Sequence, residues 1–140
     1  MKTYTMSKLV KSEDLNHHGT LFAGRMAEWF IEGAFIAAAS TYKNPDNMVC
    51  LKMHGLKFTC PVQKGAIITL ETKVIYTGNT SMTVYGKVVK NGDIEKVIVD
   101  GFTTFICVDE DGKKMPHNIV LQEPENEEEA KLREYAKNLK

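Results

Sequence analysis

A short polar turn and two glutamates are the residues of this chain best suited to chemistry. The turn begins at Asn16 and leads directly into a long apolar segment. That segment carries Arg25, Glu28 and Glu32 at positions i, i+3 and i+7, so a helix would place all three on one face. A carboxylate near a helix N-terminus could activate water or attack directly, while the backbone N–H groups stabilise developing negative charge.

The apolar segment that follows the turn is predicted to be a helix. We expect it to begin between residues 20 and 24, with Thr20 able to cap it if it starts early, and to end near residue 40, before the turn signal at 44–47. Apolar residues occupy most of its circumference, so the rest of the fold must cover it on most sides.

Strand-forming residues fill most of the remaining chain. Asn91-Gly92 favours a type I′ hairpin turn, and Gly55 predicts a bulge or bend within a strand. The composition predicts strands over residues 2–10, 48–62, 66–77, 80–90 and 94–108. This order indicates an α+β domain, in which an antiparallel sheet wraps around the helix and its edges favour pairing with another copy.

The last part of the chain is predicted to be a charged helix. Pro124 suits its first turn, glutamates lie near its start, and lysines and an arginine lie toward its end, as the helix dipole favours. We expect residues 122–140 to form a solvated surface helix that belongs to the same domain as residues 1–121.

Bulk composition excludes several classes of function. The chain has 140 residues, with 18 basic and 18 acidic side chains, so its charge gives no reason to bind nucleic acid or an anionic membrane. No apolar run reaches the roughly 20 residues that span a bilayer. Cys50, Cys60 and Cys107 lack metal-binding spacing, and we expect them to be reduced, buried thiols of a cytoplasmic protein.

Four segments of the chain resemble hotdog-fold acyl-CoA thioesterases. Residues 16–24, NHHGTLFAG, are similar to the family's N-x-x-[GN]-T-L-F-G-G. The other three are 58–65 (FTCPVQKG), 76–82 (YTGNTSM) and 105–113 (FICVDEDGK). The resemblance covers about residues 5–116. It implies a sheet curled around one long central helix, dimers joined edge to edge that often form tetramers or hexamers, and active sites at the dimer interface.

The resemblance also implies roles for individual residues. The N–H groups of Ala23 and Gly24 would form the oxyanion site, and Asn16 would orient the thioester or the attacking water. Asn16 has a second interpretation, as a turn residue only. Residues expected to contact the acyl-CoA substrate are His18, Thr20, Phe22, Thr80 and Ser81.

The sequence departs from the family pattern at the catalytic carboxylate. The family typically has an aspartate seven residues after the second glycine, where this chain has Ile31. Glu32 lies about 100° further around the helix, and a one-residue helix bulge would bring it into place. Glu28 lies roughly 60° from the Ile31 direction, so in a regular helix it points closer to the position of the family's aspartate than Glu32 does. We place Glu32 ahead of Glu28, although both could instead pair with Arg25 and other residues at an oligomer interface.

The predicted function is hydrolysis of acyl-CoA to a free acid and coenzyme A, without a metal or redox cofactor. Two alternatives remain open. One is a non-catalytic acyl-CoA-binding hotdog protein in which Ile31 marks loss of the aspartate. The other is a hotdog dehydratase or hydratase, which would need a histidine together with a carboxylate on the helix.

Overall fold

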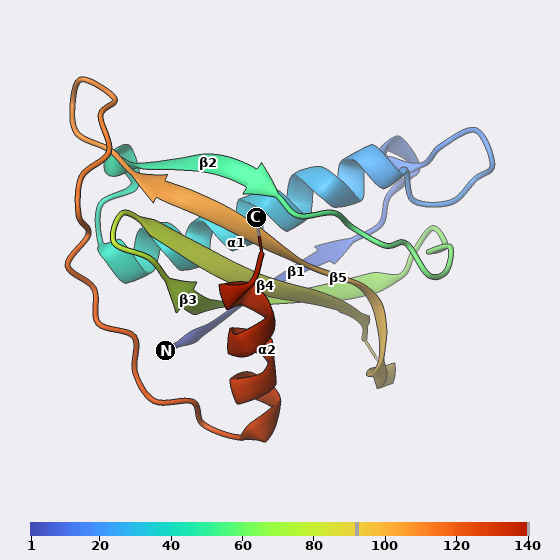
Figure 1. Ribbon diagram of the computed structural model, residues 1–140. Coiled ribbons are helices and arrows are strands. Elements are labelled where there is room, and N and C mark those ends of the chain that lie inside the picture. The colour runs from blue at the N-terminus through green and yellow to red at the C-terminus, as the bar shows by residue number, and fades with distance from the viewer. Residues whose placement is uncertain (92, 140) are drawn as a thin grey trace.

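One antiparallel sheet wraps around a long helix. The computed structural model describes residues 1–91 and 93–139. The strands are β1 (Thr3–Leu9), β2 (Met48–Met53), β3 (Ile67–Thr77), β4 (Ser81–Lys90) and β5 (Asp93–Cys107). They pair in the order β1-β3-β4-β5-β2, with every neighbouring pair antiparallel. Helix α1 (Ala23–Tyr42) lies behind the sheet in Figure 1, and α2 (Glu127–Lys137) crosses in front of it.

This arrangement confirms the predicted α+β architecture, with the long helix at its centre. The type I′ turn expected at Asn91-Gly92 lies outside the described residues. Two short 3-10 helices, Ser12–Asp14 and Pro45–Asn47, flank α1 at its two ends.

The buried face of α1 forms the core with the sheet. Phe30 is fully buried, and Ala34 and its neighbours pack against apolar side chains of β3, β4 and β5. The close approach requires a small residue at Gly33, because a Cβ there would lie 2.2 Å from Cδ2 of Leu70. The hydroxyl of Thr72 donates to the Gly33 carbonyl at 3.0 Å, so this polar group is satisfied inside the core.

Helix α1 begins without the predicted cap. The helix starts at Ala23, within the predicted range, and Phe22 occupies the N-cap position, so Thr20, which was expected to cap an earlier start, does not cap it. The helix is α-helical without interruption as far as Tyr42, so the proposed bulge before Glu32 is absent. No helix in the described part of the chain has the length and hydropathy to cross a membrane.

The strand predicted over 48–62 ends early, at Met53. Gly55 lies beyond the end of β2 and not within a strand, and it adopts a φ of 101°; its carbonyl lies 2.7 Å from where a Cβ of Gly101 would be. Beyond the bend the chain runs irregularly beside β5, held by backbone bonds from His54 to Phe102 (2.9 Å) and from Thr59 to Ile98 (3.3 Å). These two bonds are five residues apart, so they do not form a continuous ladder with β5.

Helix α2 packs on the sheet rather than lying wholly in solvent. It starts after Asn126, whose side chain accepts a hydrogen bond from Glu129 N at 2.8 Å, so Pro124 precedes the helix. Ala136 is buried in a cluster with Ile75 of β3, to which Phe102, Leu132 and Leu139 also contribute. The predicted charged helix is therefore correct in type, but one of its faces is covered.

A buried carboxylate ties α2 to β3. Glu129 is only 5% exposed and forms ion pairs with Lys73 and with Arg133 (2.7 Å). Burial by itself would raise the pKa of Glu129, but the hydrogen bonds and charges of Lys73 and Arg133 outweigh it and hold the pKa below its usual value.

Candidate active site

A cavity of about 280 Å³ opens where α1 begins. It lies between the polar turn, the first turn of α1, the irregular segment after β2, and β5. Its lining comprises Asn16, Leu21, Ala23, Met26, Phe58, Thr59, Cys60, Pro61, Val62 and Val99. The cavity thus joins two of the four segments that resemble the thioesterase family, 16–24 and 58–65.

Two backbone N–H groups are free at this end of α1. Within the described residues, the N–H groups of Ala23 and Gly24 donate no hydrogen bond, whereas those of Arg25 and Met26 donate to the carbonyl of Phe22 at 3.0 and 3.1 Å. Ala23 and Gly24 are exposed and carry little or no side chain. Free amides at the positive end of a helix dipole favour an oxygen that carries negative charge.

The side chain of Asn16 holds the polar turn together. Its Oδ1 accepts hydrogen bonds from His18 N (2.9 Å) and Thr20 N (3.2 Å), and its Nδ2 donates to Thr20 Oγ1 at 3.1 Å. The structure therefore supports the turn interpretation of Asn16. One N–H of the Nδ2 group has no partner among the described residues, and Asn16 also lines the cavity. The structure is therefore compatible with both interpretations of Asn16, as a turn residue and as a group that orients the thioester or the attacking water.

The other predicted contacts of the turn lie outside the cavity. His18 is exposed, with its ring 3.9 Å from that of His17. Phe22 is 53% exposed and its ring covers Gly24, where a Cβ would lie 2.6 Å from the ring. Thr20 forms an isolated bridge with Gln63, which joins the turn to the segment before β3.

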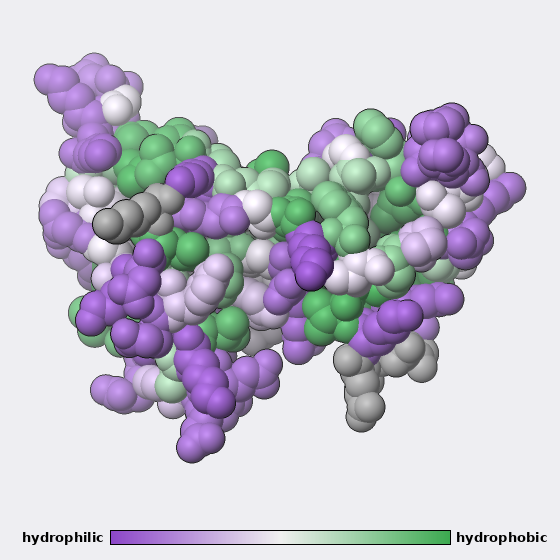
Figure 2. All heavy atoms as spheres, turned by 45° about the vertical axis from the view of Figure 1, so that its right-hand side comes forward, coloured by the Kyte–Doolittle hydropathy of each residue, from purple (hydrophilic) through white to green (hydrophobic). Residues whose placement is uncertain are grey.

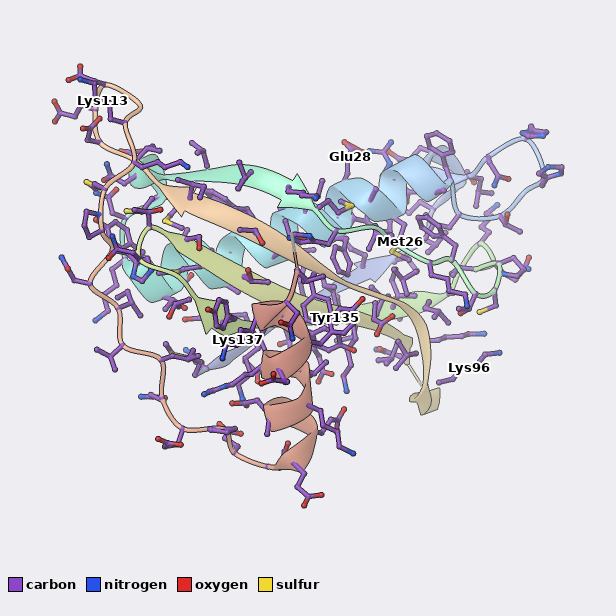
Figure 3. All side chains as sticks on the ribbon, in the orientation of Figure 1. Met26, Glu28, Lys96, Lys113, Tyr135 and Lys137 are labelled. Carbon is purple, nitrogen blue, oxygen red and sulfur yellow. The ribbon has the colours of Figure 1, made fainter. Side chains whose placement is uncertain are left out.

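Neither candidate carboxylate lines the cavity of its own chain. Glu28 is exposed and pairs with Arg25 at 3.3 Å. Glu32 is exposed and forms no ion pair with the described residues. In a regular helix these positions lie roughly 140° and 180° around the axis from Ala23. Figure 3 shows Glu28 on the outer side of α1, whereas Met26 lies toward the segment after β2.

Thr80 and Ser81 lie at the other end of the sheet. The carbonyl of Thr80 accepts from Cys107 N at 2.7 Å, and Ser81 pairs with Ile106. Val99, which lines the cavity, precedes Ile106 by seven residues of β5, about 23 Å at roughly 3.3 Å per residue. One chain therefore does not bring Thr80 and Ser81 to the cavity beside Ala23.

Sequence reasoning missed Asp14, which lies at the base of the turn. It is 4% exposed, pairs with Arg25 Nε at 3.3 Å and Lys11 Nζ at 3.7 Å, and accepts a hydrogen bond from Lys11 N at 2.9 Å. Its own carbonyl accepts from Phe22 N at 2.9 Å, so Asp14 fixes the start of α1.

A larger hollow, of about 630 Å³, lies on the opposite face under α2. Tyr85 lines it, and burial together with a hydrogen bond to Asp100 raises the pKa of that phenol. Unlike the smaller cavity, it is not lined by residues of the segments 16–24 and 58–65 that resemble the thioesterase family. Among the described residues, no group of three His, Cys, Asp or Glu side chains is placed to hold a metal ion.

The three cysteines are free thiols, but only Cys107 is buried. Cys50 is exposed on the edge strand β2, and Cys60 is half-buried in the cavity lining, so the expectation of three buried thiols was wrong.

Comparison with known proteins bears directly on this site. The sequence profile of the thioesterase superfamily matches residues 18–97. The uncharacterized acyl-CoA thioester hydrolase YkhA of Bacillus subtilis is 33% identical over 135 residues, which cover 90% of this chain and 76% of YkhA. The chain belongs to the hotdog-fold acyl-CoA thioesterase family.

Solved structures of the family share the fold. An apo-hexameric acyl-CoA thioesterase superposes with a TM-score of 0.85 at 31% identity, and the match covers 96% of this chain and 86% of that one. An acyl-CoA hydrolase from Bacillus cereus gives a TM-score of 0.85 at 28% identity, covering 96% and 81% of the two chains. The predicted hotdog fold is thereby confirmed.

Proposed function

We propose that this chain hydrolyses acyl-CoA thioesters at the start of α1. The observation that carries the proposal is the pair of free N–H groups on Ala23 and Gly24 beside a cavity. Attack of water on the thioester carbonyl would place negative charge on its oxygen, and these two donors stabilise that charge before the coenzyme A thiolate leaves. Loss of one such donor typically costs about a hundredfold to a thousandfold in rate.

The carboxylate in this proposal is Glu32, supplied by a second copy of the chain. Glu32 follows Ala23 by nine residues, about 13.5 Å along the helix at 1.5 Å per residue, and lies on the opposite side of α1. It therefore cannot reach the Ala23 amide of its own chain. Glu28 is the second candidate, placed behind Glu32 because its charge is already paired with Arg25.

An apolar surface near Glu32 supports pairing with that second copy. Ile36, one turn beyond Glu32, is exposed, as are Val49 and Leu51 on the edge strand β2. Figure 2 shows hydrophobic surface along the upper side of the molecule, where Figure 1 places β2 and α1. We propose a homodimer joined along this surface, or a larger assembly built from it, because the exposed edge of β2 can also extend the sheet into the partner.

The remaining site residues take supporting roles in this proposal. The unused N–H of Asn16 donates to the thioester or to the attacking water, and Thr20 and Phe22 shape the entrance. His18 contacts the coenzyme A part of the substrate, as do Thr80 and Ser81 of the second copy. Hydrolysis by a base and two amides requires no metal or redox cofactor. We place the protein in the cytoplasm, where its free thiols stay reduced.

The test is release of free thiol from acyl-CoA substrates of stepped chain length, detected with a thiol reagent. Glu32→Gln and Glu28→Gln are matched variants that remove a charge and keep the size of the side chain. We expect Glu32→Gln to lower kcat by about a hundredfold or more, as loss of a general base does, and Glu28→Gln to stay within about threefold.

Other outcomes would change the proposal. The reverse result would assign the base to Glu28, and equal rates in both variants would remove both glutamates from the mechanism. Tight binding of acyl-CoA without turnover at any chain length would indicate a non-catalytic acyl-CoA-binding protein, as the loss of aspartate at Ile31 allows. Size-exclusion chromatography with light scattering checks the dimer, and a monomeric, fully active enzyme would refute the shared site.

A further inference from the structure

The Met26 side chain separates two cavities. On one side it lines the 280 Å³ cavity that opens at Ala23. On the other side it lines a closed cavity of about 10 Å³ between α1 and the sheet. The remaining walls of the closed cavity are Met6, Lys8, Trp29, Phe30, Ile68, Leu70 and Val88. Among the residues that the structure describes, Met26 alone lines both cavities.

The position of Met26 follows from the helix. It is three residues after Ala23 and four before Phe30, so the three lie along the side of α1 that faces the sheet. Met26 is 3% exposed and packs in one apolar cluster with Leu21 and Val62. An acyl chain whose thioester carbonyl lies at the free amides, and which runs inward along α1, meets the Met26 side chain first.

The space in front of Met26 is suited to an apolar chain. Leu21, Val62 and Val99 are buried members of the core cluster, and each also lines the 280 Å³ cavity. Behind Met26, the closed cavity is walled mainly by aliphatic and aromatic side chains, so apolar surface continues in the same direction. Methionine is unbranched and adapts its shape readily, and the Met26 residue lines both cavities.

We infer that Met26 is the floor of the acyl pocket and sets the length of acyl chain that the site accepts. The inference rests on the proposed function, because it assumes that the thioester carbonyl sits at the Ala23 and Gly24 amides. An apolar cavity of about 150 Å³ admits benzene, so 280 Å³ holds the thioester carbonyl and roughly seven further carbons. The wild-type enzyme should therefore favour acyl groups of up to about eight carbons.

Shortening Met26 tests this directly. Met26→Ala removes three side-chain heavy atoms and joins the two cavities, so the preferred chain should lengthen by about three carbons. Each buried methylene is worth about fourfold in an equilibrium constant, and three are worth at most about sixtyfold. We expect kcat/KM for an eleven-carbon acyl-CoA, relative to kcat/KM for a four-carbon acyl-CoA, to rise toward this limit.

Met6→Ala is the matched control. Met6 lines the closed cavity from β1 but does not line the open one, so its removal enlarges the closed cavity and leaves the Met26 wall in place. This variant should keep the wild-type chain-length profile. Met26→Leu conserves volume and should also keep it, and Met26→Val gives a smaller lengthening if Met26→Ala does not fold.

The outcomes separate the inference from the proposed function. If hydrolysis occurs but Met26→Ala and Met26→Val keep the wild-type profile, or if Met6→Ala lengthens it equally, the inference is overturned. If the wild-type protein hydrolyses no acyl-CoA, the proposed function fails. Binding of S-alkyl-CoA thioethers of stepped length, measured by calorimetry, then tests separately whether Met26 is the floor of the pocket. A longer limit of alkyl length in Met26→Ala would support this role of Met26, and an unchanged limit would refute it.

Discussion

Removing the carboxylate of Asp14 should destabilise the start of α1 without touching the chemistry. Asp14 is buried, does not line the cavity, and holds together the 3-10 turn before it and Arg25 after it. We consider two substitutions. Asp14→Ala removes every side-chain contact, whereas Asp14→Asn keeps the size and an oxygen acceptor and removes the charge.

The expected costs follow from the contacts. The hydrogen bond from Lys11 N to the charged carboxylate is worth roughly 1.5–3 kcal/mol. The ion pair with Arg25, whose side chain is 39% exposed, adds only about 0.2–1 kcal/mol because solvent screens it. Asp14→Ala should therefore lower the free energy of unfolding by about 2–4 kcal/mol, and Asp14→Asn by about 0.5–2 kcal/mol because its acceptor is uncharged.

The assay combines urea unfolding at one fixed protein concentration with thiol release from acyl-CoA. Protein concentration must be fixed because pairing of two copies contributes to apparent stability. We expect the asparagine variant to retain kcat within about threefold. A hundredfold loss of kcat with normal stability would make Asp14 the catalytic carboxylate and refute the assignment to Glu32. A cost below about 0.5 kcal/mol for Asp14→Ala would refute the energetic reasoning about burial.

Two other substitutions test the helix start and the attachment of α2. Gly24→Ala would place a Cβ 2.6 Å from the Phe22 ring, so the ring must move aside. We expect the free energy of unfolding to change by no more than about 1 kcal/mol and kcat/KM to fall at least tenfold. An unchanged kcat/KM would show that the position of the ring does not matter to the site. Glu129→Gln should lower stability by about 2 kcal/mol at pH 7, because Lys73 and Arg133 lose a buried partner. The folded-state pKa of Glu129 is depressed, so its contribution is present above the unfolded value of about 4.3 and is lost as pH falls through the lower folded value. Urea midpoints between pH 2 and pH 7 should therefore converge for wild type and variant in acid, and a constant difference would contradict the ion pair.

Much of the fold could be predicted because its patterns are local. Alternation of apolar residues predicted β3 and β4 to within about a residue, and the apolar run after the turn predicted α1. The strand predicted over residues 48–62 ends at Met53 in the structure. The composition is typical of a strand over the whole segment, so the sequence did not indicate this end. Whether a ladder continues depends on the partner strand, and beyond Met53 the segment keeps separate backbone bonds to β5 from His54 and Thr59 in place of a regular ladder.

The site divides in the same way. The sequence by itself determined the family, through four motifs in order, and the place where the helix begins, because both depend on residues adjacent in the chain. Only the tertiary structure decided that the segment after β2 faces Ala23 across a cavity and that Asp14 is buried against Arg25. It also decided that a regular helix turns Glu28 and Glu32 away from that cavity. Burial and the direction of a side chain arise from contacts between distant segments, and spacing along the chain does not record them.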